Sequence, residues 1–212
     1  MIKQERAVRT RAAFIKAAAE LFDHHGYHAT SLAQVSRAAG HSMGALTFHF
    51  SSKHELADHI AAEGRHRLTA VLDSLRAVSE SPLDKMVRLS AAFADLLDTD
   101  CMLRASMTLA HDRKQNDLLA ELWLPAIGRL VEQAFAEGRI APSISRGDVC
   151  ALAEHLMRGA SACRGPHLTP AGSPIRSAET LTRLWMVALA GLSVLGTGRI
   201  PDETAQGRLL TS

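Results

Sequence analysis

Cysteine is scarce in this 212-residue sequence, and its placement gives no disulfide framework. The three cysteines are Cys101, Cys150 and Cys163, and no two of them form a Cys-x-x-Cys motif. Unpaired cysteines of this kind usually behave as small hydrophobic side chains in a reducing compartment. We therefore expect free thiols within an ordinary hydrophobic core.

Long apolar runs are missing as well. The longest clean run, residues 185–195, is much shorter than the roughly 20 residues that a membrane-spanning helix needs. Lys16 and Glu20 interrupt the segment that follows the basic N-terminus, so no signal-peptide core is present. These absences predict a soluble, cytoplasmic protein without a membrane partner.

Aromatic residues (4%) and prolines (7) are few, and no run of alternating β-branched residues predicts a sheet, whereas Ala, Leu and Arg are plentiful. The composition and the spacing of the apolar positions predict an all-α fold of about nine helices. The first of them is expected to end at Gly26, a residue suited to a left-handed helix end. We expect helices over residues 6–25, 31–39, 42–48, 52–78, 82–98, 101–112, 116–137, 146–163 and 177–196.

Capping residues mark the starts of the short helices near the N-terminus. Ser31 with Gln34 has the spacing of a capping box, and so has Ser52 with Glu55. Ser42 is placed to cap the helix between them. The sequence thus predicts two short helices in succession, followed by a much longer one.

The two short helices and the turn at residues 39–41 form a helix-turn-helix, whose second helix enters the major groove of DNA. A small core of three helices is expected from Phe14, Ala18, Phe22, Leu32, Val35, Leu46 and Phe50. This core leaves Ser42, Met43, Gly44 and Thr47 pointing outwards. Glycine inside a short helix costs about 1 kcal/mol relative to alanine, so Gly44 indicates a close approach of the backbone to another surface.

Positive charge is concentrated in the same part of the chain. Residues 1–67 hold 9 Lys or Arg against 6 Asp or Glu, and residues 68–212 hold 15 against 16. Lys53 opposes the dipole of the helix that it begins, a conflict that a bound phosphate would remove. A basic N-terminal arm can contact phosphates or the minor groove through Lys3, Arg6, Arg9 and Arg11. Each cation alone is also compatible with a solvated surface charge, but together they indicate a polyanionic partner.

A set of residues with fixed spacing runs through about residues 5–60. Its members are Thr10, Phe14, Ala18, Phe22, Gly26, Tyr27, Thr30, Ser31, Leu32, Ala39, Gly40, Gly44, Ala45, Leu46, Phe48, His49, Phe50, Lys53 and Leu56. This pattern resembles the DNA-binding domain of TetR-type transcriptional repressors. Within that family, the segments KQERAVRTR and GALTFHF are most similar to the γ-butyrolactone (butanolide) autoregulator receptors of actinomycetes.

The resemblance implies roles for individual residues on DNA. Phosphate contacts are implied for Thr30, Ser31, Ser42, His49 and Lys53. Contacts with bases or with the DNA backbone are implied for Met43, Gly44 and Thr47. The chain departs from the family where His41, Met43 and Thr47 replace the usual Val, Lys and Tyr. The missing lysine and phenol remove two phosphate partners, so the affinity or the choice of operator is expected to differ.

The rest of the chain is expected to form a helical bundle large enough to hold a cavity. The butanolide receptors place a tryptophan in this region against the effector, which implies that Trp123 lines a pocket; ordinary core packing is the alternative. The candidate ligand-binding residues are Met86, Phe93, Met107, Trp123, Ile127 and Met157. Few charged residues share these helix faces, so a small, neutral, mostly apolar effector is expected.

Two apolar stripes near the C-terminus predict a homodimer through the last two helices. One consists of Val149, Leu152, Leu156, Ala160 and Cys163. The other consists of Leu181, Leu184, Trp185, Ala188, Leu192 and Leu195. A dimer would place two recognition helices about 34–36 Å apart, which predicts a palindromic operator in double-stranded DNA.

No catalytic, metal-binding or cofactor motif emerges. Ser193 lacks the second glycine of a nucleophile elbow, and the Gly26 break separates His24 and His25 from His28. We expect a helix-turn-helix domain over residues 1–60, a ligand-binding and dimerisation domain over 61–197 and a flexible tail over 198–212. The predicted function is a ligand-responsive repressor; the alternative is a small-molecule carrier or decoy with weakened DNA binding.

Overall fold

The structure is a computed structural model that describes residues 2–76, 78–115, 117–162, 167–168, 174–175 and 177–194. Nine α-helices and one π-helix make up nearly all of this described part, which confirms the all-α fold. The helices are α1 (Ile2–Ala29), α2 (Leu32–Ala38), α3 (Met43–His49), α4 (Lys53–Arg76), α5 (Pro82–Thr99), α6 (Cys101–Asp112), η1 (Leu119–Trp123), α7 (Leu124–Ala136), α8 (Arg146–Ala162) and α9 (Ser177–Val194).

A short antiparallel pair, β1 (His167–Leu168) with β2 (Pro174–Ile175), was not expected. Strands of two residues are too short to leave an alternating pattern in the sequence. The expected tail over 198–212 lies outside the described residues. Within the described part, no helix has both the length and the hydropathy of a membrane span.

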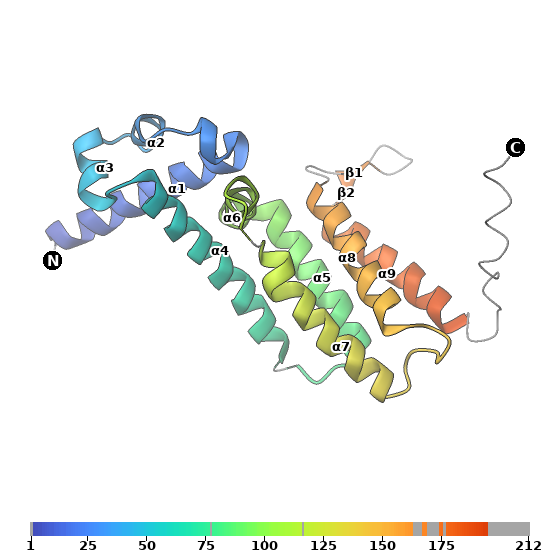
Figure 1. Ribbon diagram of the computed structural model, residues 1–212. Helices are drawn as coiled ribbons and strands as arrows, with labels where there is room; N and C mark the ends of the chain where they lie inside the picture. The colour runs from blue at the N-terminus through green and yellow to red at the C-terminus, as the bar shows by residue number, and fades with distance from the viewer. Residues whose placement is uncertain are drawn as a thin grey trace, which may run out of the picture.

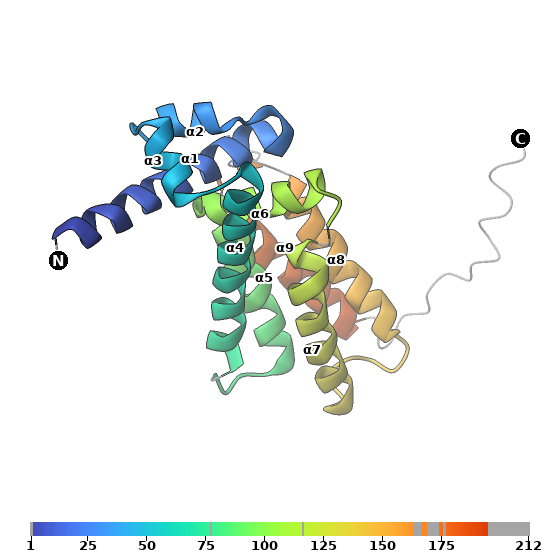
Figure 2. The ribbon, with the colours of Figure 1, turned by 60° about the vertical axis from the view of Figure 1, so that its left-hand side comes forward.

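The helices form two connected bodies (Figure 1). Helices α1, α2 and α3 lie at one end, and α4 runs from them along the larger bundle. In that bundle α5 packs against α7 and α9, and α8 packs against the same two helices. Helix α6 contacts both α1 and α4 and lies where the two bodies meet (Figure 2). The boundary expected at residue 60 falls inside the continuous helix α4.

The predicted caps of the short helices are present. Ser31 and Gln34 form a reciprocal capping box, and the hydroxyl of Ser42 accepts a hydrogen bond of 3.2 Å from the N–H of Ala45. The pair Ser52 and Glu55 differs from the expected box. Ser52 caps the N–H of Glu55, but the Glu55 carboxylate accepts hydrogen bonds of 2.7 Å from the N–H and the hydroxyl of Ser51. These bonds stabilise the carboxylate and lower the pKa of Glu55.

Gly26 bends α1 instead of ending it. Its φ of 78° is left-handed, yet helical residues continue to Ala29 beyond the kink. The N–H of Tyr27 donates a hydrogen bond of 2.7 Å to Oδ2 of Asp112 in α6. A Cβ on residue 26 would lie 2.7 Å from the same oxygen, so both the backbone angle and the contact with α6 require glycine.

Two hydrophobic cores stabilise the chain. The first contains the residues expected from the helix-turn-helix, together with Leu56, Ala57 and Ile60 of α4 and Met102, Ala105 and Leu109 of α6. The second core fills the larger bundle between α4 and α9. The expected three-helix core is therefore incomplete on its own, because helix α6, distant in sequence, closes one side of it.

The helix expected over residues 116–137 contains a π turn. The N–H of Leu124 bonds to the carbonyl of Leu119, five residues earlier, and α7 begins directly after this turn. Pro125 lacks the N–H that would bond to the carbonyl of Glu121, so a regular α-helical ladder cannot continue through this point. The turn fixes the position of Trp123 at the entrance to α7.

Candidate nucleic-acid interface and effector cavity

Helix α3 presents one face to the core and the other to solvent. Leu46 is fully buried beneath it, as are Phe14 of α1 and Val35 of α2. The outward orientation predicted for four residues is confirmed, since all four are exposed: Ser42, Met43, Gly44 and Thr47. Phe48, for which the sequence pattern predicted no role, is 82% exposed. Phe48 follows Gly44 by four residues, so both lie on the same side of the helix, and this spacing is the sequence signal for the exposure of Phe48.

Thr30 does not fit a phosphate contact through its side chain. It is 2% exposed, and its hydroxyl donates a hydrogen bond of 2.8 Å to the carbonyl of Gly26. The hydroxyl therefore closes the kinked end of α1, and the phosphate contact implied for Thr30 stays a prediction that its side chain does not support. Ser31, the next residue, is exposed, and its hydroxyl donates to the side-chain oxygen of Gln34.

Lys53 has partners inside the chain. Its Nζ donates to the carbonyls of Tyr27 and Thr30 at 2.9 and 3.0 Å and lies 4.2 Å from the centre of the Tyr27 ring. These carbonyls lie at the negative end of the α1 dipole, so they offset the unfavourable interaction of the Lys53 cation with the dipole of α4. A bound phosphate is therefore not required to offset this dipole, and the phosphate contact implied for Lys53 stays a prediction for its third N–H.

The basic arm divides into exposed and internal residues. Arg9 is exposed, whereas the guanidinium of Arg11 lies 4.9 Å from the Phe50 ring and 3.5 Å from the nitrogens of His59. Burial and the nearby Arg11 lower the pKa of His59. Arg9 thus remains available to a partner, whereas Arg11 packs within the domain.

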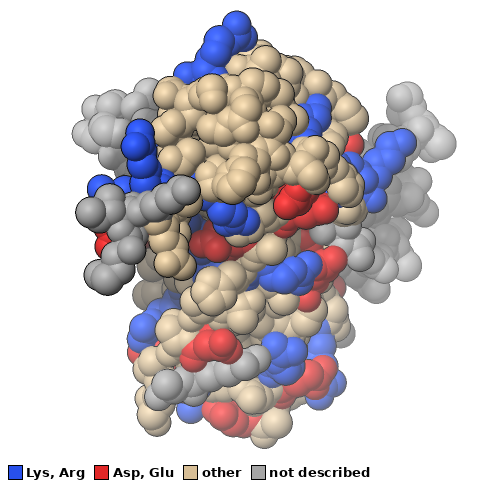
Figure 3. All heavy atoms as spheres, turned by 90° about the vertical axis from the view of Figure 1, so that its left-hand side faces the viewer, with Lys and Arg blue, Asp and Glu red and all other residues tan. Residues whose placement is uncertain are grey.

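The two histidines near α3 lie against aromatic rings. His41 is exposed, with its ring 5.4 Å from that of Phe14. His49 is half-buried between Phe14, at 6.1 Å, and Phe48, at 5.2 Å. The surface that faces away from the larger bundle is mostly uncharged in its upper part, with Lys and Arg side chains along its margins (Figure 3).

The six candidate ligand-binding residues lie together in the second core. Met86, Phe93, Trp123, Ile127 and Met157 are fully buried, and Met107 is packed against them at its edge. Nε1 of Trp123 is buried without a hydrogen-bond partner, and so is Nε1 of Trp185 in α9. An unpaired buried donor is unfavourable, so each indole N–H is suited to an acceptor that comes from outside the chain.

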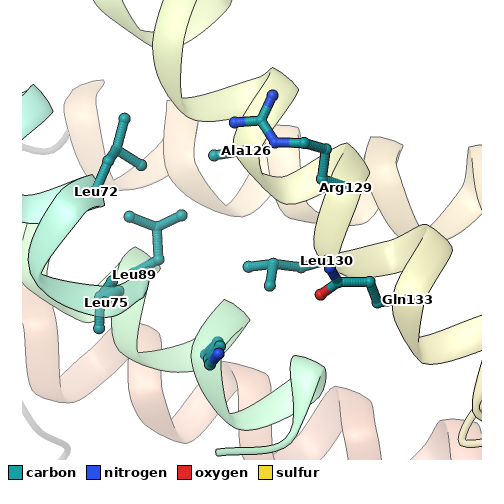
Figure 4. A pocket seen from close by; sticks show the side chains of 8 residues that line it. Leu72, Leu75, Leu89, Ala126, Arg129, Leu130 and Gln133 are labelled. Carbon is teal, nitrogen blue, oxygen red and sulfur yellow. The ribbon is translucent and has the colours of Figure 1, made fainter. Parts of the chain in front are cut away.

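A cavity of about 250 Å³ opens between α4, α5 and α7 (Figure 4). None of the six candidate residues lines it. Its walls are Leu72, Leu75, Lys85, Leu89, Ala126, Arg129, Leu130 and Gln133. Leu75, Leu89 and Ala126 belong to the same core cluster as Trp123, so the cavity adjoins the core that contains the candidates. Apolar walls with a few polar groups are typical of small-molecule sites.

A second cavity, of about 460 Å³, lies between α4, α6 and the π turn. Arg65 of α4 and Glu121 of the π turn line it and form an ion pair across it. The ion pair thus connects the π turn to α4, the helix that begins in the helix-turn-helix domain.

Helix α6 joins this region to the helix-turn-helix domain. Asp112 bonds to Tyr27, and Arg104 donates a hydrogen bond of 2.8 Å to the buried carboxylate of Asp23. A Cβ on Gly64 of α4 would lie 2.2 Å from Oγ of Ser106, so α4 and α6 approach each other closely. The three helices are therefore held as a unit.

The two apolar stripes near the C-terminus, predicted to form the dimer interface, are partly buried inside the chain and only partly exposed. Leu181 and Trp185 of α9, and Val149 of α8, are buried in the chain's own core. Leu152, Leu156, Ala160 and Ala188 are half-buried. Among the described side chains of α9, the large apolar residues that are exposed are Leu184, Met186 and Val187, at 45%, 62% and 73%. The side chains of Cys163, Leu192 and Leu195 lie outside the described residues.

Comparison with known sequences matches residues 14–60 to the family of bacterial regulatory proteins called the tetR family. The A-factor receptor protein of Streptomyces griseus is 30% identical over 151 residues, which cover 68% of this chain. The chain spans about half the length of that relative, since the match covers 51% of it.

Comparison with solved structures gives similar proteins over nearly the whole chain. A γ-butyrolactone receptor, an ArpA-like protein, has a TM-score of 0.72 and 28% identity, over 92% of this chain and 94% of its own. CprB from Streptomyces coelicolor, solved with its biological operator sequence, has a TM-score of 0.65 and 25% identity, over 87% and 98%. The first two of these relatives are receptors, and CprB is a TetR family protein.

Proposed function

Because the chain has the TetR fold and its residues 14–60 belong to the tetR family of bacterial regulatory proteins, we propose that it is a DNA-binding transcriptional repressor that a small molecule releases from its operator. The operator is a palindrome in double-stranded DNA, which the protein binds as a homodimer. The effector is a small apolar compound of the butanolide type or an antibiotic-like compound. Binding to chromosomal operators places the protein in the cytoplasm.

The observation that carries the proposal is the exposed face of α3 above a buried core. Met43, Gly44 and Thr47 project where a major groove would lie, and nothing in the described part of the chain covers them. The hydroxyls of Ser31 and Ser42 lie at the starts of α2 and α3, where phosphates are bound by helix N-termini in other proteins. Further phosphate contacts come from Arg9, His49 and the remaining N–H of Lys53. Thr30 supports this surface from below.

The proposed effector site is the core around Trp123, reached through the cavity between α4, α5 and α7. Nε1 of Trp123 would donate to a carbonyl or lactone oxygen of the effector, which would supply the hydrogen bond that the indole lacks. Phe93, Ile127 and Met157 would surround its apolar part. Lys85 and Arg129 line the cavity, where a polar end of the effector would lie.

The proposed dimer forms through α8 and α9. Leu184, Met186 and Val187 make an apolar surface on α9 that is unusual for a monomer. A second copy, related by a two-fold axis, would cover this surface with its own α9 and leave both α3 helices free. Leu181 and Trp185 stabilise the protomer instead, because they are buried within it.

The effector would act on DNA binding through α4 and α6. The π turn that carries Trp123 is joined to α4 by the ion pair of Glu121 with Arg65. The same α4 begins beside Tyr27 and Thr30 through Lys53, so a shift of α4 would move the helix-turn-helix domain. The effector must bind the released form more tightly than the DNA-bound form, because otherwise no population shifts.

A titration with and without operator tests the proposal. A synthetic alkyl-substituted γ-butyrolactone is titrated by tryptophan fluorescence into the protein alone and into its complex with DNA from upstream of its own gene. The operator should weaken butyrolactone binding by the factor by which butyrolactone weakens operator binding. Binding of the butyrolactone without any salt-dependent binding of DNA would instead support the carrier or decoy.

A further inference from the structure

The stretch of chain that contains α3 carries no formal charge. Residues 38–52 contain no Asp, Glu, Lys or Arg, although charged residues flank them at Arg37 and Lys53. The space-filling view agrees, because the upper part of the exposed face is largely uncharged and its cations lie at the margins (Figure 3). Lys and Arg contacts with phosphate therefore come from around α3, and the exposed face of α3 itself must recognise DNA by other means.

That face is apolar. Phe48 is 82% exposed and Met43 is 43% exposed, and both belong to the seven residues of α3. The hydroxyl of Thr47 lies 3.2 Å from the carbonyls of Met43 and Gly44, so its hydrogen is used within the helix. Thr47 then offers a partner its methyl group and an acceptor, but no free donor. Exposed apolar side chains gathered in this way mark interaction surfaces.

Gly44 lets another molecule come close to these side chains. Among the described residues, a Cβ at this position would meet only Oγ of Ser42, at 4.0 Å, so no contact within that part of the chain requires glycine here. Because Gly44 has no side chain, the surface of the helix is lower at this position than at the neighbouring Thr47 and Phe48. A base edge can approach the helix backbone there.

Each base pair offers a different chemistry in the major groove. Guanine is usually bound by Arg or Lys, adenine by Asn or Gln, and cytosine by Asp or Glu. Helix α3 has none of these residues. Thymine alone presents a methyl group, which apolar side chains such as Thr and Phe contact. The apolar face of α3 therefore fits the thymine methyl group better than any other base edge.

We propose that Met43, Thr47 and Phe48 form an apolar surface that reads the 5-methyl groups of thymines in each operator half-site. This inference rests on the proposed DNA-binding function, and it names thymine as the base that α3 recognises. It assigns Phe48 a direct role in the choice of operator.

The test uses the full chain and a randomised library of DNA duplexes. Repeated selection yields a preferred palindrome, which is then made with deoxyuridine in place of each half-site thymidine. Uracil keeps the hydrogen-bonding groups of thymine and lacks only its methyl group. Binding should weaken about four-fold for each contacted methyl group removed, which corresponds to the burial of one methyl group. Deoxyuridine placed outside the half-sites should change nothing.

Protein variants identify the side chains that read the methyl groups. Phe48→Ala alters an exposed residue, so the fold should be retained, and thermal unfolding checks this. The variant should bind the thymine duplex more weakly and lose most of its preference over the uracil duplex. Ser31→Ala is the matched control, which should weaken binding to both duplexes by the same factor.

The possible outcomes separate the inference from the proposed function. Tight, selective binding that is equal for thymine and uracil duplexes, or selected half-sites without thymine, would overturn the inference and leave the repressor intact. An unchanged preference in Phe48→Ala would remove Phe48 from the reading surface. A library that yields no enriched sequence would overturn the DNA-binding function and the inference with it.

Discussion

Nε of Arg104 in α6 donates a hydrogen bond of 2.8 Å to the carboxylate of Asp23 in α1, and the side chain of Asp23 is only 3% exposed. The same guanidinium donates to the carbonyl of Leu97 at 2.9 Å. One arginine thus connects the DNA-binding domain to the end of α5 in the larger bundle. The domains are joined by a buried polar contact as well as by the continuous helix α4.

Removal of this contact should destabilise the chain. Asp23→Asn is expected to lower the free energy of unfolding by about 2 kcal/mol, because it leaves a partly buried guanidinium without its charged partner. Urea unfolding followed by circular dichroism measures the change. Glu132→Gln is the control, since the pair of Glu132 with Arg146 is exposed and should contribute less than about 0.5 kcal/mol. Equal effects of the two variants would contradict the structural role of Asp23.

Lys53 should influence both stability and DNA binding. Lys53→Met removes two hydrogen bonds to carbonyls and the contact with the Tyr27 ring, so unfolding should become easier by about 1–2 kcal/mol. If its third N–H binds a phosphate in each protomer, the slope of log K against log salt concentration should fall by about 1.8 per dimer. An unchanged slope with reduced stability would assign Lys53 to folding alone.

Trp123 should control the response to the effector. Trp123→Phe keeps an aromatic ring and removes the unpaired Nε1, so the response to γ-butyrolactone should be lost while operator binding remains. Gel retardation of the operator, with and without the butyrolactone, gives both quantities. Trp185→Phe is the matched control, since it removes the other unpaired indole N–H of the same core. Loss of operator binding in Trp123→Phe would show that this residue is structural.

The exposed residues of α9 should determine the oligomeric state. Val187→Glu places a charge in the proposed interface, and the dimer should dissociate because a carboxylate is costly to bury without a partner. Analytical ultracentrifugation measures the mass. Ala70→Glu, on an exposed position of α4, is the control and should leave the mass unchanged. A dimer that persists in Val187→Glu would place the interface elsewhere.

His59 should make the stability depend on pH. Its pKa in the folded chain lies below the ordinary value of 6.5, because of burial and Arg11. The unfolded chain therefore binds more protons below about pH 6.5, and the stability contributed by neutral His59 is lost as the pH falls through this range. His59→Gln should flatten the change in urea midpoint between pH 7 and pH 5. An identical pH dependence in both proteins would contradict the shift.

Much of the helix-turn-helix could be predicted because its signals are local. Ser31, Gln34 and Ser42 cap helices within three residues of themselves, and Leu46 shows its inward direction by helical spacing. The same spacing predicted the exposed Met43 and Thr47. Phe48 received no role, although its position one turn after Gly44 places it on the same outward face.

The internal roles of Thr30 and Lys53 could not be predicted from spacing. Both depend on the kink at Gly26, which turns the last carbonyls of α1 towards them. At the kink, the N–H of Tyr27 bonds to Asp112, which is distant in sequence. The cavity between α4, α5 and α7 likewise depends on how far three helices stand apart, which no single helix encodes.

The sequence by itself determined the all-α architecture, the limits of the short helices and the outward face of α3, since capping and apolar spacing act over a few residues. Only the tertiary structure decided that Leu181 and Trp185 lie inside the protomer while Leu184 and Val187 remain exposed. All four belong to one apolar helix, α9. Which side of such a helix is buried depends on the neighbours that pack against it, and α5 supplies that neighbour only after the chain has folded.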